Sequence, residues 1–320
     1  MKVALFFTAL FIFNVQAARI KVGVLTPEGT NWANHFKKMG KEIEKATNKE
    51  VKFKFYFGGA QGDEVDVLRK VRINQLQGGV FTGKTLGEIH GDIRVVEIPF
   101  VFGGDRQKAW STVEKLTPYF NDKVQAKGFK SLGFFEIGLV YFVSQKKTEN
   151  LSALNGVKIW SWEGDQIVEA MIEKMNLVSV PLPLPDVLSS LSTGIIQAAY
   201  APAMPIVALQ WSTKVKYLVD FPIAFSVGSF LLSDKAWAKI SPEHQKIVSS
   251  IAEKYMKKVN TSNVEDNKQA MDLIKGKGVE FLTFPKADQD KARTLKQEIM
   301  TKLKGKLFSD EALKKLNSVL

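Results

Sequence analysis

The chain has 320 residues, no cysteine and a formal net charge of +12. That length can bury a core without disulfides and suggests two domains. The lysines are dispersed among glutamates and aspartates, and no arginine–aromatic patch stands out. The charge therefore indicates solvated helix faces rather than a nucleic-acid surface. We expect no nucleic-acid partner.

The N-terminus has the parts of a secretory signal peptide. Met1-Lys2 is a short basic start, Val3–Val15 is a mostly apolar run, and small residues follow it. The run is shorter than the roughly 20 apolar residues that span a bilayer. We predict that residues 1–17 are a signal peptide, cleaved near Ala17-Ala18. Without a cysteine there is no site for an N-terminal lipid, so the expected location is the periplasm, without a lipid anchor.

Strand and helix patterns alternate through the first part of the chain. Apolar residues recur with period 2 in the strands and at helical spacing in the helices. Short connections predict a sheet with helices on both faces. The predicted strands are 19–25, 51–57 and 79–82, and the predicted helices are 31–46 and 63–76.

The next stretch is less regular. Residues 95–104 are too apolar for an ordinary loop. Residues 105–127 are interpreted as two short helices around Thr117-Pro118, because proline interrupts a helix. Two strands, 129–136 and 138–144, nearly abut.

From residue 157 the α/β alternation starts again, which predicts a second lobe. Beyond it, Ser241–Lys275 is expected to be one long helix, with Pro242 in its first turn. The remaining predicted strands are 157–160, 178–181, 195–200, 225–233 and 279–284, and the remaining helices are 163–175, 186–191 and 286–303.

Residues that would support catalysis are sparse. His35, His90 and His244 are isolated, so no zinc-binding pair is recognised. There is no GxSxG motif for a nucleophilic serine. The glycine pairs at 58–59, 78–79 and 103–104 lack phosphate-loop spacing and are interpreted as turns that need a positive φ. We therefore expect a binding protein, not an enzyme, with no catalytic residue, metal or cofactor.

Residues 151–205 carry a recognisable pattern. Leu154–Ile159, Pro181–Asp186 and Leu191–Ile196 resemble, in order, segments of the solute-binding proteins of tripartite ATP-independent periplasmic (TRAP) transporters, the DctP-like family. Residues 76–80 and 97–102 resemble two further segments of that family. The resemblance covers nearly the whole mature chain.

The resemblance implies a two-lobe, type II-like periplasmic-binding-protein fold, α/β in class, with hinge strands and a long helix spanning both lobes. A small ligand would bind between the lobes and pass to an integral-membrane TRAP permease. We assign 18–140 with about 222–255 to lobe I. We assign 141–221 with about 256–320 to lobe II and the spanning and C-terminal helices.

The sequence departs from the family at one position of consequence. In the family, the segment that Leu154–Ile159 resembles ends in an arginine that pairs with a substrate carboxylate. Here that position is Trp160. A planar guanidinium suits a carboxylate better than any other side chain. The family also has acidic and amide residues after the segment that Leu191–Ile196 resembles. Here Gln197–Ala201 replaces them with mostly apolar and aromatic residues. An apolar or weakly polar ligand is therefore expected.

The predicted ligand-binding residues belong to two groups. Some surround the substituted arginine position, and others follow strands, because open α/β sheets bind ligands beyond the carboxyl ends of their strands. Trp160 and Trp162 would point to opposite faces if their strand continues. The first group is Trp160, Trp162, Tyr200 and Ala201; the second is Glu28, Asn31, Trp32, Gln61, Thr82, Glu136 and Phe225.

Other functions stay open. A conventional organic-anion binder could use Arg69, Arg72, Arg94 or Lys158 in place of the missing arginine. A non-enzymatic interaction scaffold would have a cleft filled by its own side chains. The long helix has a broad apolar stripe, so a homodimer or an accessory periplasmic partner is a further alternative.

Overall fold

The computed structural model describes residues 17–320, so the predicted signal peptide lies outside the described residues except for Ala17. One mixed sheet, in the order β2-β1-β3-β8-β4-β7-β5-β6 with β9 beside β8, organises the chain. The strands are β1 (Ala18–Gly23), β2 (Val51–Tyr56), β3 (Gly78–Thr82), β4 (Phe129–Ser144), β5 (Lys158–Ser161), β6 (Val178–Pro181), β7 (Ala198–Pro202), β8 (Tyr217–Ser233) and β9 (Glu280–Leu282).

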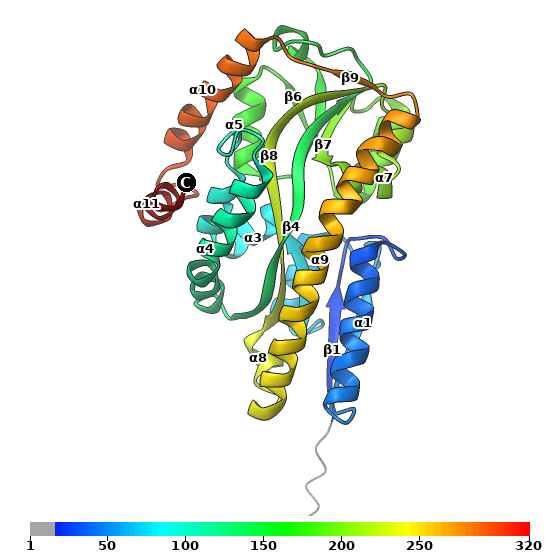
Figure 1. Cartoon of the computed structure of the whole chain (residues 1–320), viewed down its shortest axis with the longest axis vertical. Coiled ribbons are helices and arrows are strands. Elements are labelled where there is room, and N and C mark those ends of the chain that lie inside the picture. Colours follow the sequence, from blue (N-terminus) through cyan, green and yellow to red (C-terminus); the bar gives the residue numbers. More distant parts are fainter. Residues whose placement is uncertain (1–16) are drawn as a thin grey trace, which may run out of the picture.

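Helices cover both faces of this sheet (Figure 1). The α-helices are α1 (Asn31–Ala46), α2 (Glu64–Arg72), α3 (Gly83–Ile89), α4 (Arg106–Gln125), α5 (Gln166–Lys174), α6 (Val187–Thr193), α7 (Ala203–Ala208), α8 (Asp234–Trp237), α9 (Pro242–Gly276), α10 (Lys286–Leu303) and α11 (Asp310–Val319). The 3-10 helices are η1 (Gly91–Glu97), η2 (Ser152–Leu154), η3 (Leu184–Asp186) and η4 (Trp211–Thr213). In residues 17–320, none of the helices combines the length and the apolar character that crossing a bilayer would require.

The two lobes share their two longest strands. β4 and β8 pair antiparallel along the long axis of the molecule, with β3, β1 and β2 added at one end and β7, β5 and β6 at the other (Figure 1). The chain therefore crosses between the lobes on continuous strands, which confirms the predicted two-lobe α/β fold.

β4 corrects the prediction of two abutting strands. It is one strand whose register against β8 shifts between Ser131 and Gly133 and again between Glu136 and Gly138. Gly133 and Gly138 have φ of 140° and 136°, so glycine absorbs both bulges. A Cβ on Gly133 would lie 2.6 Å from Cγ of Met256, so the bulge also lets α9 approach closely.

Helix α9 confirms the predicted long helix and crosses both lobes. Three asparagines on one face satisfy the backbone at the second bulge of β4: Asn260 accepts from Glu136 N–H at 2.8 Å, while Asn263 and Asn267 donate to the carbonyls of Glu136 and Ile137 at 2.6 and 2.7 Å. A bulge leaves backbone groups without ladder partners, and buried ones need replacements. The helix therefore supplies the hydrogen bonds that the bulge removes.

Two local predictions were wrong. Residues 106–125 form the single helix α4, because Pro118 lies on its exposed side while buried Val113, Leu116 and Phe120 continue the apolar stripe across it. Gly78-Gly79 is not a turn but lies in β3, where a Cβ on Gly78 would meet the Leu231 carbonyl oxygen at 2.5 Å. Close packing rather than a positive φ requires glycine there.

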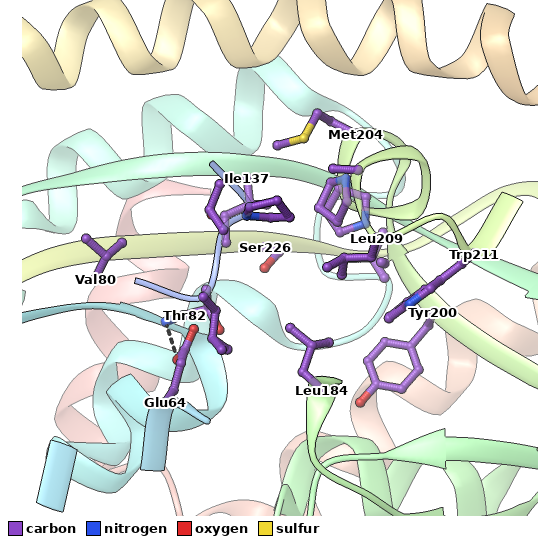
Figure 2. A pocket seen from close by; sticks show the side chains of 18 of the residues that line it. Glu64, Val80, Thr82, Ile137, Leu184, Tyr200, Met204, Leu209, Trp211 and Ser226 are labelled. Carbon is purple, nitrogen blue, oxygen red and sulfur yellow. Dashed lines mark hydrogen bonds between the residues drawn. The ribbon is translucent and has the colours of Figure 1, made fainter. Parts of the chain in front are cut away.

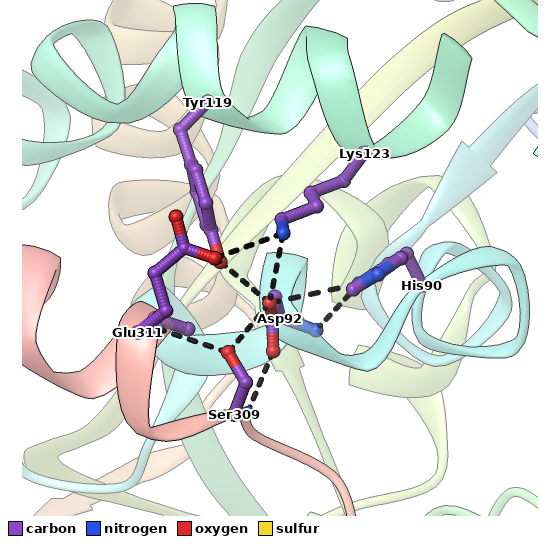
Figure 3. A network of polar contacts seen from close by, with 7 residues as sticks. His90, Asp92, Tyr119, Lys123, Ser309 and Glu311 are labelled. Carbon is purple, nitrogen blue, oxygen red and sulfur yellow. Dashed lines mark hydrogen bonds and ion pairs between the residues drawn. The ribbon is translucent and has the colours of Figure 1, made fainter. Parts of the chain in front are cut away.

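The two C-terminal helices pack against different parts of the molecule. α10 packs on α5, as Figure 1 shows, whereas α11, which the sequence did not predict, contacts η1 and α4. The predicted lobe boundary groups α11 with lobe II, yet its contacts are with residues of lobe I. Asp92 in η1 fixes this helix by accepting from Ser309 N–H and Oγ–H and from the Tyr119 hydroxyl (Figure 3).

Candidate ligand-binding cavity

A cavity lies where the two lobes meet, beside the carboxyl ends of β1 and β3 and the starts of α7 and η4. The space between its walls is about 840 Å3, part of which is open to solvent. Figure 2 shows Glu64, Val80 and Thr82 on one side and Tyr200, Leu209 and Trp211 on another. Residues far apart in the sequence therefore build one site.

Aromatic rings dominate one wall of the cavity. Trp160 is 2% exposed and stacks on Tyr200 at a centroid distance of 5.0 Å and an interplanar angle of 22°. Trp162 and Trp211 lie against the Trp160 ring, at centroid distances of 5.1 and 5.5 Å. The indole N–H of Trp160 donates to the Leu182 carbonyl at 2.9 Å, so its only polar group is already used. Such a wall offers π faces and apolar edges rather than charge.

Trp160 and Trp162 were expected on opposite faces if their strand continued. The strand β5 ends at Ser161, so alternation no longer governs Trp162, and both tryptophans line the same cavity. Because the strand does not continue past Ser161, the two tryptophans need not point to opposite faces.

Among the described residues that line this cavity, Glu64 is the only Asp, Glu, Lys, Arg or His. It is the first residue of α2 and is 2% exposed, and one of its oxygens accepts from Thr82 N–H at 2.8 Å (Figure 2). Burial raises the pKa of Glu64 to about 8, because the charged form is desolvated and the Thr82 hydrogen bond offsets this only in part. The carboxyl group is therefore protonated at neutral pH.

Trp32 contributes an unsatisfied donor. It is the second residue of α1, after the Thr30 N-cap, and its ring packs edge-on against Phe135 at 5.4 Å. The side chain is 5% exposed and its Nε1–H is buried without a hydrogen-bond partner. A buried donor left unpaired costs about 1–3 kcal/mol, so this group favours a ligand that can accept from it.

Arg94 lies beside a second space of about 520 Å3 that shares Thr82, Trp162 and Tyr200 with the first. Its Nε is 2.6 Å from a Glu97 oxygen, and one of its terminal nitrogens donates to both Asp165 oxygens at 3.1 Å. All three groups are buried, and burial raises the pKa of Glu97 although the Arg94 guanidinium opposes this. Its guanidinium is already committed to two carboxylates.

The local fold makes room for this cluster. A Cβ on Gly83, the first residue of α3, would lie 1.7 Å from a Glu97 oxygen, so a larger residue there would displace the Glu97 carboxyl group. Asp165 is also the N-cap of α5 and accepts from Ile167 N–H at 3.2 Å. The pair of Arg94 and Asp165 therefore ties a helix start of one lobe to η1 of the other.

Asp63 makes a second link across the cavity. It is the N-cap of α2 in lobe I, and its Oδ2 accepts from the indole N–H of Trp162 at 2.9 Å and from Leu184 N–H at 3.3 Å, both in lobe II. A single carboxylate thus holds a helix start and two groups of the opposite lobe.

The structure brings many of the predicted site residues to this cavity. Its lining includes Trp32, Thr82, Trp160, Trp162, Tyr200 and Ala201. Phe225 lines the adjoining space beside Arg94.

The other predicted residues lie elsewhere. Glu28 pairs with Lys37 on the surface, and Asn31 donates to Asp266 of α9 at 2.6 Å. The carbonyls of Gln61 accept from Lys70, and Glu136 forms an ion pair with Arg106 outside the cavity. Each has a partner within the protein.

The sequence interpretation missed several lining residues. Asp63 and Glu64 were assigned only to a helix start, and nothing in their spacing indicates burial against the opposite lobe. Apolar lining residues such as Leu184, Met204 and Trp211 have no sequence signal that separates them from core residues. Within residues 17–320, no group of three His, Asp or Glu side chains is placed to hold a metal ion.

Residues 22–306 match the family model described as bacterial extracellular solute-binding protein, family 7. The chain belongs to this family. The match confirms the resemblance to DctP-like TRAP solute-binding proteins, which are periplasmic, bind small ligands and deliver them to membrane permease components. It is therefore an extracytoplasmic transport protein and not an enzyme.

Named relatives are distant. A protein of unassigned function from Haemophilus influenzae is 25% identical over 243 residues, covering 76% of this chain and 73% of its own. The 2,3-diketo-L-gulonate-binding periplasmic protein YiaO of Escherichia coli is 22% identical over 285 residues, covering 88% and 86%.

Solved structures share the fold. A TRAP periplasmic solute-binding protein of H. influenzae with bound L-gulonate superposes with a TM-score of 0.87 at 22% identity, covering 94% of this chain and 98% of its own. One from Desulfovibrio salexigens with bound orotic acid gives 0.85 at 19% identity, covering 95% and 100%. At this identity the likeness establishes the architecture alone.

Proposed function

We propose that this protein is a TRAP receptor for an uncharged, apolar or weakly polar molecule, bound between its lobes and handed to the membrane permease. The observation that carries the proposal is the cavity wall. Aromatic and aliphatic side chains form most of it, and no Lys, Arg or His of residues 17–320 is among its lining residues. A carboxylate enclosed there would be desolvated without a counter-charge, which is costly.

The alternative is a conventional organic-anion receptor, which the acids named for its structural relatives make plausible. Of its candidate cations, Arg69, Arg72 and Lys158 are exposed and do not line the cavity. Arg94 is buried beside it but already faces two carboxylates. An incoming anion would have to displace Glu97 or Asp165, which favours the uncharged ligand.

A scaffold without a ligand is the third candidate. The space between the lobes, which side chains do not fill, favours binding over a scaffold role. We further propose export with cleavage near Ala17-Ala18 and no lipid anchor, the lobe boundaries at about residues 140, 222 and 255, and a binding set that contains Trp32, Thr82, Trp160, Trp162, Tyr200 and Ala201. A homodimer through α9 remains a separate proposal.

The deciding experiment identifies what the purified protein carries. Mass spectrometry of solvent extracts should recover an uncharged molecule, and thermal-shift measurements with malate, gluconate and glucuronate should leave the melting temperature unchanged. Strong stabilisation by these anions, lost in Arg94→Gln, would instead establish the anion receptor.

A further inference from the structure

We infer that Trp32 and Glu64 form a paired hydrogen-bond donor site in the cavity, and that it binds a carbonyl, hydroxyl or ether oxygen of an uncharged ligand. The inference rests on the proposed uncharged ligand and names the chemistry that recognises it. It goes beyond the aromatic wall, because that wall alone would accept any apolar molecule.

The first step is that both groups belong to the cavity and are held rigidly. Trp32 and Glu64 both line it, and each is nearly buried. Trp32 is fixed by the start of α1 and by Phe135, while Glu64 is fixed by the start of α2 and by Thr82 N–H. Two donors on two helix starts of lobe I therefore present a preorganised polar edge.

The second step is that both groups have capacity to donate. The Trp32 indole N–H makes no hydrogen bond within the described residues. Glu64 forms no ion pair there, and its carboxyl group accepts from Thr82 N–H and lies beside the Thr82 and Thr85 hydroxyls. The charged group that acts on it is Asp63, next to it on the same helix start, which disfavours ionisation, and the polar neighbours from the other side are Thr82 and Thr85. A carboxyl group that keeps its proton is a hydrogen-bond donor.

The third step concerns which ligands fit. Two donors without a full positive charge suit an oxygen acceptor, whereas a carboxylate ligand would leave its charge uncompensated. Most of the remaining lining is apolar and includes Val24, Val80, Ile137, Leu184, Met204 and the rings of Trp160, Trp162 and Trp211, whereas Thr26, Thr82 and Ser226 add hydroxyl groups. The molecule expected here has an aliphatic or aromatic body and an oxygen acceptor at the end that meets lobe I.

Four probes of one shape separate the possibilities: 4-phenylbutan-2-one, butylbenzene, 4-phenylbutanoate and 4-phenylbutylamine. Their affinities for the full-length mature protein are measured by calorimetry and by tryptophan fluorescence. The ketone should bind at least tenfold more tightly than butylbenzene and the carboxylate. Glu64→Leu and Trp32→Phe should each remove most of that advantage, whereas Glu64→Gln, which keeps a donor, should remove less. Above pH 8 the wild-type advantage should fall about tenfold per pH unit.

Matched controls are Glu253→Gln and Trp237→Phe, which change the same residue types outside the cavity. Circular dichroism checks that each variant folds. If the ketone binds no better than butylbenzene, or if its advantage survives Glu64→Leu and Trp32→Phe, the donor site is wrong while the uncharged-ligand proposal stands. Tightest binding of the carboxylate would overturn the proposed function itself. Tightest binding of the amine, lost in Glu64→Gln, would show that Glu64 acts as an anion and overturn the inference.

Discussion

Two buried carboxyl groups, Asp92 and Glu64, are each 2% exposed, yet their surroundings differ in kind. Asp92 accepts from Tyr119 and twice from Ser309, with Lys123 and His90 nearby (Figure 3). Burial opposes its ionisation, but these hydrogen bonds outweigh burial and hold the pKa of Asp92 below its ordinary value. Desolvation raises the pKa of Glu64 to about 8, because the Thr82 N–H and the Thr82 and Thr85 hydroxyls offset it only in part and no cation is near.

The difference separates a structural carboxylate from an available one. Every oxygen of Asp92 is used to fix the C-terminal helix, which leaves nothing for a ligand. Glu64 lies at the edge of a cavity without an ion partner, and the Trp32 indole N–H in the same cavity has no hydrogen-bond partner within the described residues. Buried polar groups are normally satisfied, so the unpaired donor of Trp32 in a cavity that also contains the Glu64 carboxyl group points to a binding role.

The largest expected effect is a pH dependence of stability that Glu64→Gln removes. Below pH about 4.5 both folded and unfolded states hold the Glu64 proton, and between about 4.5 and 8 only the folded state holds it. The free energy of unfolding therefore falls as pH rises through this window, by up to about 1.4 kcal/mol per pH unit from this group. Urea titrations of both proteins at pH 5, 6.5 and 8 measure the difference. Parallel pH profiles would show that Glu64 is not protonated at neutral pH.

Asp92→Asn should come next, with a loss of about 3 kcal/mol in the free energy of unfolding at pH 7, because strong hydrogen bonds to a buried charge are broken. Glu64→Gln should cost under about 1 kcal/mol at pH 4.5, where the acid is neutral in both states, and should raise the free energy of unfolding at pH 7, because folding of the variant no longer takes up a proton. Hydrogen exchange of α11 provides the second measurement and should rise in Asp92→Asn alone. Equal losses in the two variants would remove the distinction between the carboxyl groups.

Asp63→Ala tests the link between the lobes. The change removes the acceptor for Trp162 and Leu184 and the cap of α2, so the lobes should separate more readily. The affinity for 4-phenylbutan-2-one should drop roughly tenfold, or about 1.4 kcal/mol. Small-angle scattering of the free protein should show a larger radius of gyration than the wild type. An unchanged affinity together with unchanged scattering would mean that this contact does not hold the lobes together.

The smallest effect compares two indole donors. Trp162→Phe removes a donor that Asp63 uses and should lower the free energy of unfolding by about 1 kcal/mol. Trp32→Phe removes a donor without a partner and should leave stability within about 0.5 kcal/mol or raise it. Thermal unfolding of both variants gives the comparison. A larger loss from Trp32→Phe would reveal a partner for its N–H in the free protein.

The sequence by itself determined the family and the broad architecture. Period-2 and helical patterns predicted most strands and the long helix α9, because these depend on local spacing of apolar residues. It also singled out Trp160 and Tyr200, because their positions follow an ordered motif. Pro118 misled the helix assignment, since its exposure within α4 depends on packing that no local pattern records.

Only the tertiary structure decided what the cavity contains. The contacts of Asp63 with Trp162, of Arg94 with Asp165, and of Glu64 with Thr82 join residues far apart in the chain. Protonation of a carboxyl group depends on its desolvation and neighbours, which exist only after folding. The Gly62-Asp63-Glu64 turn is in sequence an ordinary helix start. In the folded protein it provides both a link between the lobes and the proposed donor.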